Sequence, residues 1–304
     1  MKRLFSLMLL LTACHSKTPH EAPAICERAL PELLAHKSPN ALPAQAWFEL
    51  MFKGYQDGIP EDAVDCAGEP IEWPDMSHCA EGEPSSLLVE RHTKLGSEQL
   101  VVRHAGGDYW FGWAPFKRFA DGMQEGPVVI ARNHEGKLEV RAAGTLRAFP
   151  AHAKLEVREV AKEHLLIAEG ELCVDKQCER ATRVMWLDRQ RFRARPLRSV
   201  SQRQCLAPAW FPHHEQIEVK LGDRWRRVLE RELSLAFDEH GLLIDEHIRV
   251  RDHDLTQPSL PPRAFRDAAA QLRISPVQGE LLSEGHSLWR SIQVEDASTQ
   301  VAQR

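Results

Sequence analysis

The chain has 304 residues, with 39 basic and 44 acidic side chains, and its formal net charge is −5 at pH 7 when the histidines are counted as neutral. This length suits one large domain or two domains of ordinary size. A mildly acidic chain argues against nucleic acid as a partner, because binding to phosphates requires clustered positive charge.

The first fourteen residues show the order of features expected of an exported protein. Two basic residues follow the initiator methionine, an apolar run extends from Leu4 to Leu11, and two small residues precede Cys14. The apolar run has the length of a signal peptide and covers about half of the ~20 residues that a membrane-spanning helix needs. We therefore interpret residues 1–13 as a signal peptide.

The sequence Leu-Thr-Ala-Cys, which ends at Cys14, resembles the lipobox of bacterial lipoproteins. The resemblance implies cleavage before Cys14, a diacylglyceryl group on its sulfur and an acyl chain such as palmitate on its amine, with residues 14–22 as a tether. Two or three buried chains hold a protein almost permanently, at ~0.8 kcal/mol per methylene. In Gram-negative lipoproteins an Asp after this cysteine commonly retains the protein at the inner membrane. His15 occupies that position and favours the outer membrane. The alternative is an ordinary signal peptide with an incidental cysteine.

Beyond Cys14 lie six further cysteines, which are Cys26, Cys66, Cys79, Cys173, Cys178 and Cys205. An even number in an exported chain predicts disulfides, because the compartment is oxidising. Four residues separate Cys173 from Cys178, and the apolar stretches on both sides predict a hairpin that this disulfide closes. Zinc is the alternative, but its sites usually combine two close pairs of ligands and no second close pair occurs. We expect no metal or other cofactor.

The remaining four cysteines are assigned by loop length and elimination. Cys66 and Cys79 bracket a short loop with two prolines, and we expect them to pair. Cys26 and Cys205 would then form a long-range disulfide between the N-terminal region and the middle of the chain.

Two N-terminal regions have helical patterns. Residues 24–36 place apolar side chains at helical spacing, with Pro31 as an interruption, which predicts two short helical turns. Residues 43–52 form a more regular pattern that places Trp47 on an apolar face, and they predict a helix that packs on the body of the protein.

From about residue 87 to 250 the chain alternates apolar and polar residues between turn signals, as β-strands do. Residues 133–136 predict a hairpin turn with Gly136 at a positive φ. Residues 242–253 form the clearest strand, with four apolar side chains on one face and polar side chains on the other. Residues 224–237 fit a strand or a helix.

The C-terminal region is expected to be mixed. A proline-rich linker at residues 257–262 precedes a predicted short helix at 264–272. Residues 286–294 predict a final strand, and residues 296–304 a frayed tail.

An aromatic cluster is the first candidate site. It consists of Tyr109, Trp110, Phe111 and Trp113. Aromatic rings stack on sugars or peptides, so an exposed strip here would bind a glycan or a partner segment. In a strand, however, three of the four would share one face, and a row of core residues is the more common explanation.

Histidines are frequent in the C-terminal third, where the candidate ligands are His213, His214, Glu215, His240, Asp245, His247 and His253. His247 and His253 would lie roughly 20 Å apart along a strand, too far to share one ion. Asp245 would be only an ion-pair partner of His247. We therefore predict no metal site.

No sequence motif indicates catalysis. The chain has no Gly-x-Ser-x-Gly, Ser-x-x-Lys, His-Glu-x-x-His or glycine-rich phosphate loop. The leading hypothesis is a non-catalytic outer-membrane lipoprotein that acts as a binding or assembly component, with an envelope protein or a glycan as partner. The alternatives are an envelope hydrolase whose site is assembled from dispersed residues around His213, His214 and Glu215, and a purely structural spacer.

The expected fold is mainly β, of the α+β type. We predict an antiparallel β meander with short N-terminal helices, stapled by disulfides. Residues 23–200 would contain the helices and the main β body. Residues 201–304 would add strands, the linker, a short helix and the tail, within the same domain or a second one.

Overall fold

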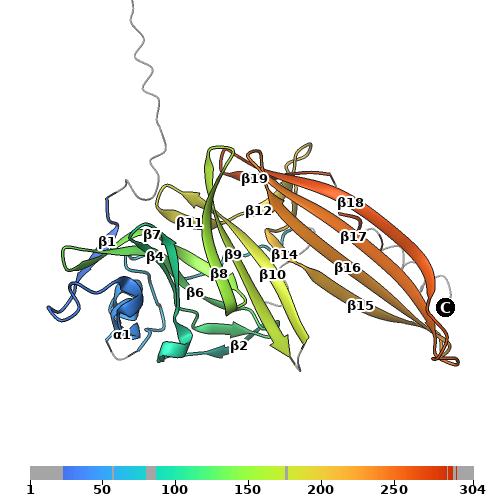
Figure 1. Cartoon of the computed structure of the whole chain (residues 1–304), viewed down its shortest axis with the longest axis horizontal. Coiled ribbons are helices and arrows are strands. Elements are labelled where there is room, and N and C mark those ends of the chain that lie inside the picture. The colour runs from blue at the N-terminus through green and yellow to red at the C-terminus, as the bar shows by residue number, and fades with distance from the viewer. Residues whose placement is uncertain are drawn as a thin grey trace, which may run out of the picture.

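The described residues are mainly β and form two sheets, with one short α-helix in the N-terminal region and helical residues again at 288, 289 and 292 (Figure 1). A computed structural model describes residues 23–56, 58–79, 87–174, 177–285, 287–289 and 292. The fold class predicted from the sequence is confirmed. The expected signal peptide, Cys14, the tether and the tail lie outside the described residues. Within them, no helix combines the length and apolar character needed to cross a membrane.

The first sheet has twelve strands. Its main path runs β2 (Leu88–Arg91), β5 (Lys117–Phe119), β6 (Gln124–His134), β7 (Lys137–Ala148), β11 (Arg191–Ala194), β10 (Gln177–Asp188), β9 (Glu163–Val174) and β8 (Ala151–Val160). Four more strands join it, with β1 (Cys26–Ala29) on β7, β4 (Tyr109–Trp113) on β6, β3 (Val101–Gly106) on β4 and β14 (Trp210–Pro212) on β10. The sheet curls, since Arg103 Nε of β3 donates a hydrogen bond to the Ala153 carbonyl of β8 at 2.8 Å.

The second sheet has seven strands, whose long members extend away from the first sheet (Figure 1). Their order is β13 (Cys205–Pro208), β12 (Pro196–Ser199), β19 (Glu280–Glu284), β18 (Arg263–Val277), β17 (Leu242–Asp254), β16 (Trp225–Phe237) and β15 (His214–Leu221). Neighbours from β15 to β19 are antiparallel, whereas β12 pairs with β19 in parallel. Because β12 precedes residue 200 and β14 follows it, both sheets draw on residues from either side of that position.

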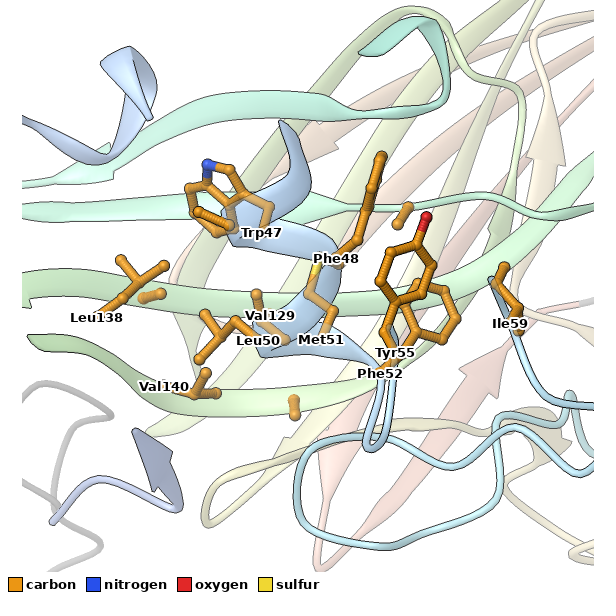
Figure 2. Close-up of a cluster of buried hydrophobic side chains, with 14 of the residues drawn as sticks. Trp47, Phe48, Leu50, Met51, Phe52, Tyr55, Ile59, Val129, Leu138 and Val140 are labelled. Atoms are coloured by element: carbon orange, nitrogen blue, oxygen red, sulfur yellow. The ribbon is translucent and has the colours of Figure 1, made fainter. Parts of the chain in front are cut away.

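Helix α1 (Ala44–Met51) covers one face of the first sheet, as the sequence predicted. Trp47 is fully buried and packs in one cluster with Val129 of β6 and Leu138 of β7 (Figure 2). Short 3-10 helices precede α1 at Pro39–Ala41 and precede β3 at Ser97–Gln99. A Cβ atom on Gly112 of β4 would lie 2.5 Å from the Trp47 ring, so this strand position has room only for glycine.

The two sheets share a second hydrophobic core. Ile167 of β9 and Trp186 of β10 pack in one cluster with Ile244 of β17 and Leu281 of β19. Strands β9 and β10 are therefore buried on both faces, because their other side chains, such as Met185, belong to the core inside the curled first sheet. This packing joins the sheets and creates the space between them.

Of the two short helical turns predicted at residues 24–36, the first is wrong, whereas a turn does begin at Pro31, whose carbonyl accepts hydrogen bonds from the N–H groups of Leu34 and Ala35. Residues 26–29 form β1, in which Cys26 pairs with Val140, and turns follow it. Leu33, one of the apolar residues at helical spacing, is 89% exposed, so that pattern did not mark a buried helix face.

Two C-terminal predictions are also wrong. Residues 264–272, predicted as a helix, belong to β18. For residues 224–237 the sequence left a strand or a helix open, and residues 225–237 form β16. Three consecutive alanines give residues 268–270 high helix propensity, but pairing with β17 overrides it. Where residues 286–294 were expected to form a strand, the described Leu288, Trp289 and Ile292 are helical.

The predicted hairpins are confirmed. β6 and β7 are joined at Glu135 and Gly136, whose φ angles are 51° and 74°. Positive φ at both positions matches a tight turn between twisted strands. At the tip of β9 and β10, Cys173 pairs with Cys178, with Cα atoms 4.0 Å apart.

The other two expected disulfides are wrong. Cys26 pairs with Cys66, and Cys79 pairs with Cys205, with Cα separations of 6.0 and 4.7 Å. Loop length misled the assignment, because β1 lies on β7 next to the loop that contains Cys66. Cys79 instead ties that loop to β13, at the edge of the second sheet.

Candidate functional site

Charged residues are interspersed among the apolar side chains on the buried face of the second sheet. In β17 the side chains of Leu242, Ile244, Ile248 and Val250 alternate toward the core, and Glu246 shares their face. In β16 the opposite partners of Ile248 and Glu246 are Arg231 and Leu233. Strand alternation therefore places this cation and this anion among apolar side chains, as it does the paired Arg227 and Asp252 farther along the same two strands.

These residues border a cavity of about 270 Å³ between the two sheets. Its apolar wall comes from both sheets and includes Leu197, Pro208, Phe211, Leu233, Ile244 and Ile274. Leu206, Ala207 and Leu272 also line it and are only partly buried, so the cavity reaches the surface near β13 and β18.

The polar end of the cavity is an ionic cluster. Arg231 forms an ion pair with Glu215 of β15, and its Nη1 lies 3.6 Å from Glu246 Oε1. Glu246 also accepts hydrogen bonds from Ser287 Oγ and from the Leu288 backbone N–H, both at 2.7 Å. These contacts offset the cost of burying the charges, which is high for an unpaired ion.

The segment that follows β19 is held against the same face. Trp289 and Ile292 are 4% and 3% exposed and pack on Leu229, Ile248 and Val250. The Arg231 guanidinium carbon lies 5.3 Å from the centre of the Trp289 ring. The polar end is therefore enclosed by protein, and the cavity is more open toward β13.

One wall of the cavity depends on a disulfide. Among the described strands, β13 is at the edge of its sheet and pairs with β12 alone there. The Cys79–Cys205 disulfide fixes its first residue to the loop that precedes β2. Leu206, Ala207 and Pro208, which line the cavity, follow directly.

The aromatic cluster predicted as a binding strip belongs mostly to the core. Tyr109, Phe111 and Trp113 are buried among the residues inside the curled first sheet. Trp110 points to the other face, is half-buried and meets the His104 ring edge-on at 5.1 Å. No continuous exposed strip is available at these four positions.

The histidines singled out in the sequence are dispersed. His213 Nε2 lies 2.9 Å from Thr182 Oγ1, but Thr182 is only 3% exposed. Burial lowers the pKa of His213 below its ordinary value, and the nearby Glu169 opposes this shift. His214 begins β15, and Glu215 next to it faces Arg231 instead of a histidine. The structure does not assemble His213, His214 and Glu215 into one site.

His247 also has a different partner from the one suggested by the sequence. Its Nε2 lies 2.6 Å from Asp267 of β18, whereas Asp245 accepts a hydrogen bond from Gln271. Spacing along one strand could not show this contact, which crosses to the neighbouring strand.

Groups of three potential metal ligands occur twice among the described residues. One contains His78 with Cys79 and Cys205, and the other contains Glu171 with Cys173 and Cys178. Both pairs of cysteines are disulfide-bonded. Since the thiolate is the form that binds metals, neither group is a site in this oxidised state.

Arg231 and Glu246 were missed by the sequence analysis. The signal was present, because Glu246 sits at an inward position between Ile244 and Ile248 in the strand predicted most clearly. A carboxylate on an apolar strand face is seldom buried without a partner. That partner, Arg231, lies on the strand whose type the sequence left open.

The fold and the cavity define a mainly antiparallel β protein of two sheets, with a largely apolar cavity that has one polar end. No family model, no curated protein and no solved structure matches the chain with a significant score.

Proposed function

We propose that the chain is a lipid-anchored binding protein of the bacterial envelope, and that the cavity between its sheets holds an apolar ligand. The observation that carries this proposal is the cavity itself. A cavity of roughly 150 Å³ with apolar walls is enough to bind benzene. At about 270 Å³, this one has room for a larger ring or a short alkyl chain.

The composition of the walls supports the same function. Small-molecule sites are usually concave and apolar, with a few converging polar groups that orient the ligand. Here the apolar walls come from both sheets, and the polar side chains of Arg231, Glu246 and Ser287 meet at one end of the cavity. Burial of apolar ligand surface would supply the affinity, and the polar end would select among ligands.

The proposed location rests on the N-terminal resemblance and on the cysteines. The lipobox that ends at Cys14 would supply the anchor, and an outer-membrane address follows from His15. Pairing of the six other cysteines in three disulfides fits an oxidising compartment. The acyl chains would hold the β body at the membrane surface, where apolar ligands concentrate.

Replacing Ala207 by phenylalanine is expected to abolish binding of an apolar probe, because the added ring would occupy the cavity. N-phenyl-1-naphthylamine, whose fluorescence rises in apolar surroundings, reports binding to the mature protein. Ala264→Phe is the matched control, since Ala264 is exposed on β18 and does not line the cavity. An equal fluorescence rise in wild type and Ala207→Phe would place the probe elsewhere and remove the support for the proposal.

A further inference from the structure

The charges of the described residues at the polar end of the cavity do not balance. Arg231 contributes one positive charge, and Glu215 and Glu246 contribute two negative charges, so the cluster has a formal charge of −1 when all three are ionised. Among the described residues that line the cavity, only Arg231 and Glu246 are charged. A ligand entering from the apolar side therefore meets an excess of negative charge.

Arg231 already interacts with other groups of the protein. Its guanidinium group faces two carboxylates and the Trp289 ring, and the Arg231 side chain is only 10% exposed. A carboxylate on a ligand would have to displace one of these partners, or would add a third negative charge to the cluster. Because charges interact strongly where water is excluded, this arrangement disfavours anionic ligands.

Glu246 is fixed in position rather than free to turn away. Its side chain is 1% exposed, one oxygen accepts the Ser287 hydroxyl, and the other accepts the Leu288 N–H. A carboxylate oxygen has two lone pairs, so each can accept a second donor from a ligand without losing the first. A protonated amine supplies such donors and the missing positive charge together.

We propose that the ligand is a cationic amphiphile, with an alkyl or aryl group against Leu233, Ile244 and Ile274 and a primary ammonium group at Glu246. This inference rests on the proposed function and specifies its ligand class. The ammonium would form a charge-assisted hydrogen bond with the buried carboxylate. It would bring the formal charge of the cluster from −1 to zero.

Calorimetry with three octyl compounds tests the inference. At pH 7 octylamine is cationic, octanol is neutral and octanoate is anionic, while the chain is the same. A charge-assisted hydrogen bond of ordinary strength predicts that octylamine binds roughly tenfold to hundredfold more tightly than octanol. Octanoate is expected to bind more weakly than octanol.

Two variants test whether the negative charge of the cluster, and not a change in folding, determines the preference for octylamine. Glu246→Gln removes the charge at the cavity wall, and Glu215→Gln removes one negative charge from a side chain that is 34% exposed and does not line the cavity. Both are expected to reduce the preference for octylamine over octanol while octanol still binds. A preference that stays unchanged in Glu215→Gln, with the variant folded, would overturn the inference even if Glu246→Gln did not fold.

The remaining outcomes are distinct. If octanoate binds as tightly as octylamine, or more tightly, the cationic ligand class is wrong but an apolar-ligand protein remains. If none of the three compounds binds, the proposed function itself fails. Dihexanoyl phosphatidylethanolamine carries the same ammonium beside a phosphate. Binding tighter than that of octylamine would identify a lipid headgroup as the source of the amine, and weaker binding would identify a free amine.

Discussion

Replacing Cys79 and Cys205 together by alanine is expected to lower the free energy of unfolding by about 5 kcal/mol. The two cysteines lie 126 residues apart in the sequence. In the chain-entropy description, a cross-link that closes so long a loop removes much of the freedom of the unfolded chain and stabilises the fold by about that amount. Urea unfolding of the oxidised double variant measures the loss.

The hairpin disulfide provides the matched control. Cys173 and Cys178 are only five residues apart, and the same relation predicts a loss of about 2 kcal/mol for their double alanine variant. Equal losses of unfolding free energy in the two variants would contradict the larger stabilisation assigned to the Cys79–Cys205 disulfide. Because Cys205 also holds the strand that lines the cavity, the Cys79/Cys205 variant should bind the apolar probe more weakly, whereas the hairpin variant should not.

Replacing Trp47 by alanine is expected to cost about 3 to 5 kcal/mol of stability, the usual range for removing a large buried aromatic side chain. Trp47 is fully buried between α1 and the first sheet, and its indole N–H donates a hydrogen bond to the Pro39 carbonyl at 3.1 Å. Denaturant unfolding measures the effect. Trp225, which is only half-buried on β16, is the matched position, and Trp225→Ala should cost less.

A second substitution, at Gly112, tests the contact between the Trp47 ring and β4 directly. In the wild-type background Gly112→Ala would push a methyl group against the Trp47 ring and should be destabilising. In the Trp47→Ala background the ring is gone, so the same change should cost much less. A double-mutant cycle measures this coupling. Additive effects of the two substitutions would show that they do not meet.

The sequence predicted the strands better than the helices, for a physical reason. The face of residues 242–253 was correct because alternation reports burial directly, and the helix at 43–52 was correct because its apolar spacing matched real burial of Trp47. The helix predicted for residues 264–272 was wrong because alanine favours a helix locally, whereas pairing with β17 stabilises a strand there. The pattern of residues within this segment carries no information about its pairing with another strand.

The candidate site was predictable only in part. Glu246 could have been noticed at its inward position, but its partners Arg231 and Ser287 come from separate segments. Likewise, the correct pairing of Cys26, Cys66, Cys79 and Cys205 depends on where β1 and β13 lie in space. A cavity between two sheets is a property of their packing, and spacing along the chain does not specify it.

Mass spectrometry of the mature protein released from membranes tests the central claim most directly. The account predicts that the denatured chain begins at an acylated Cys14, and that under native conditions it carries an additional small apolar mass which Ala207→Phe loses. A chain that keeps residues 1–13 or lacks acyl groups would contradict the anchor. A native mass equal to the denatured mass, with no apolar compound bound on addition, would contradict the ligand-holding cavity.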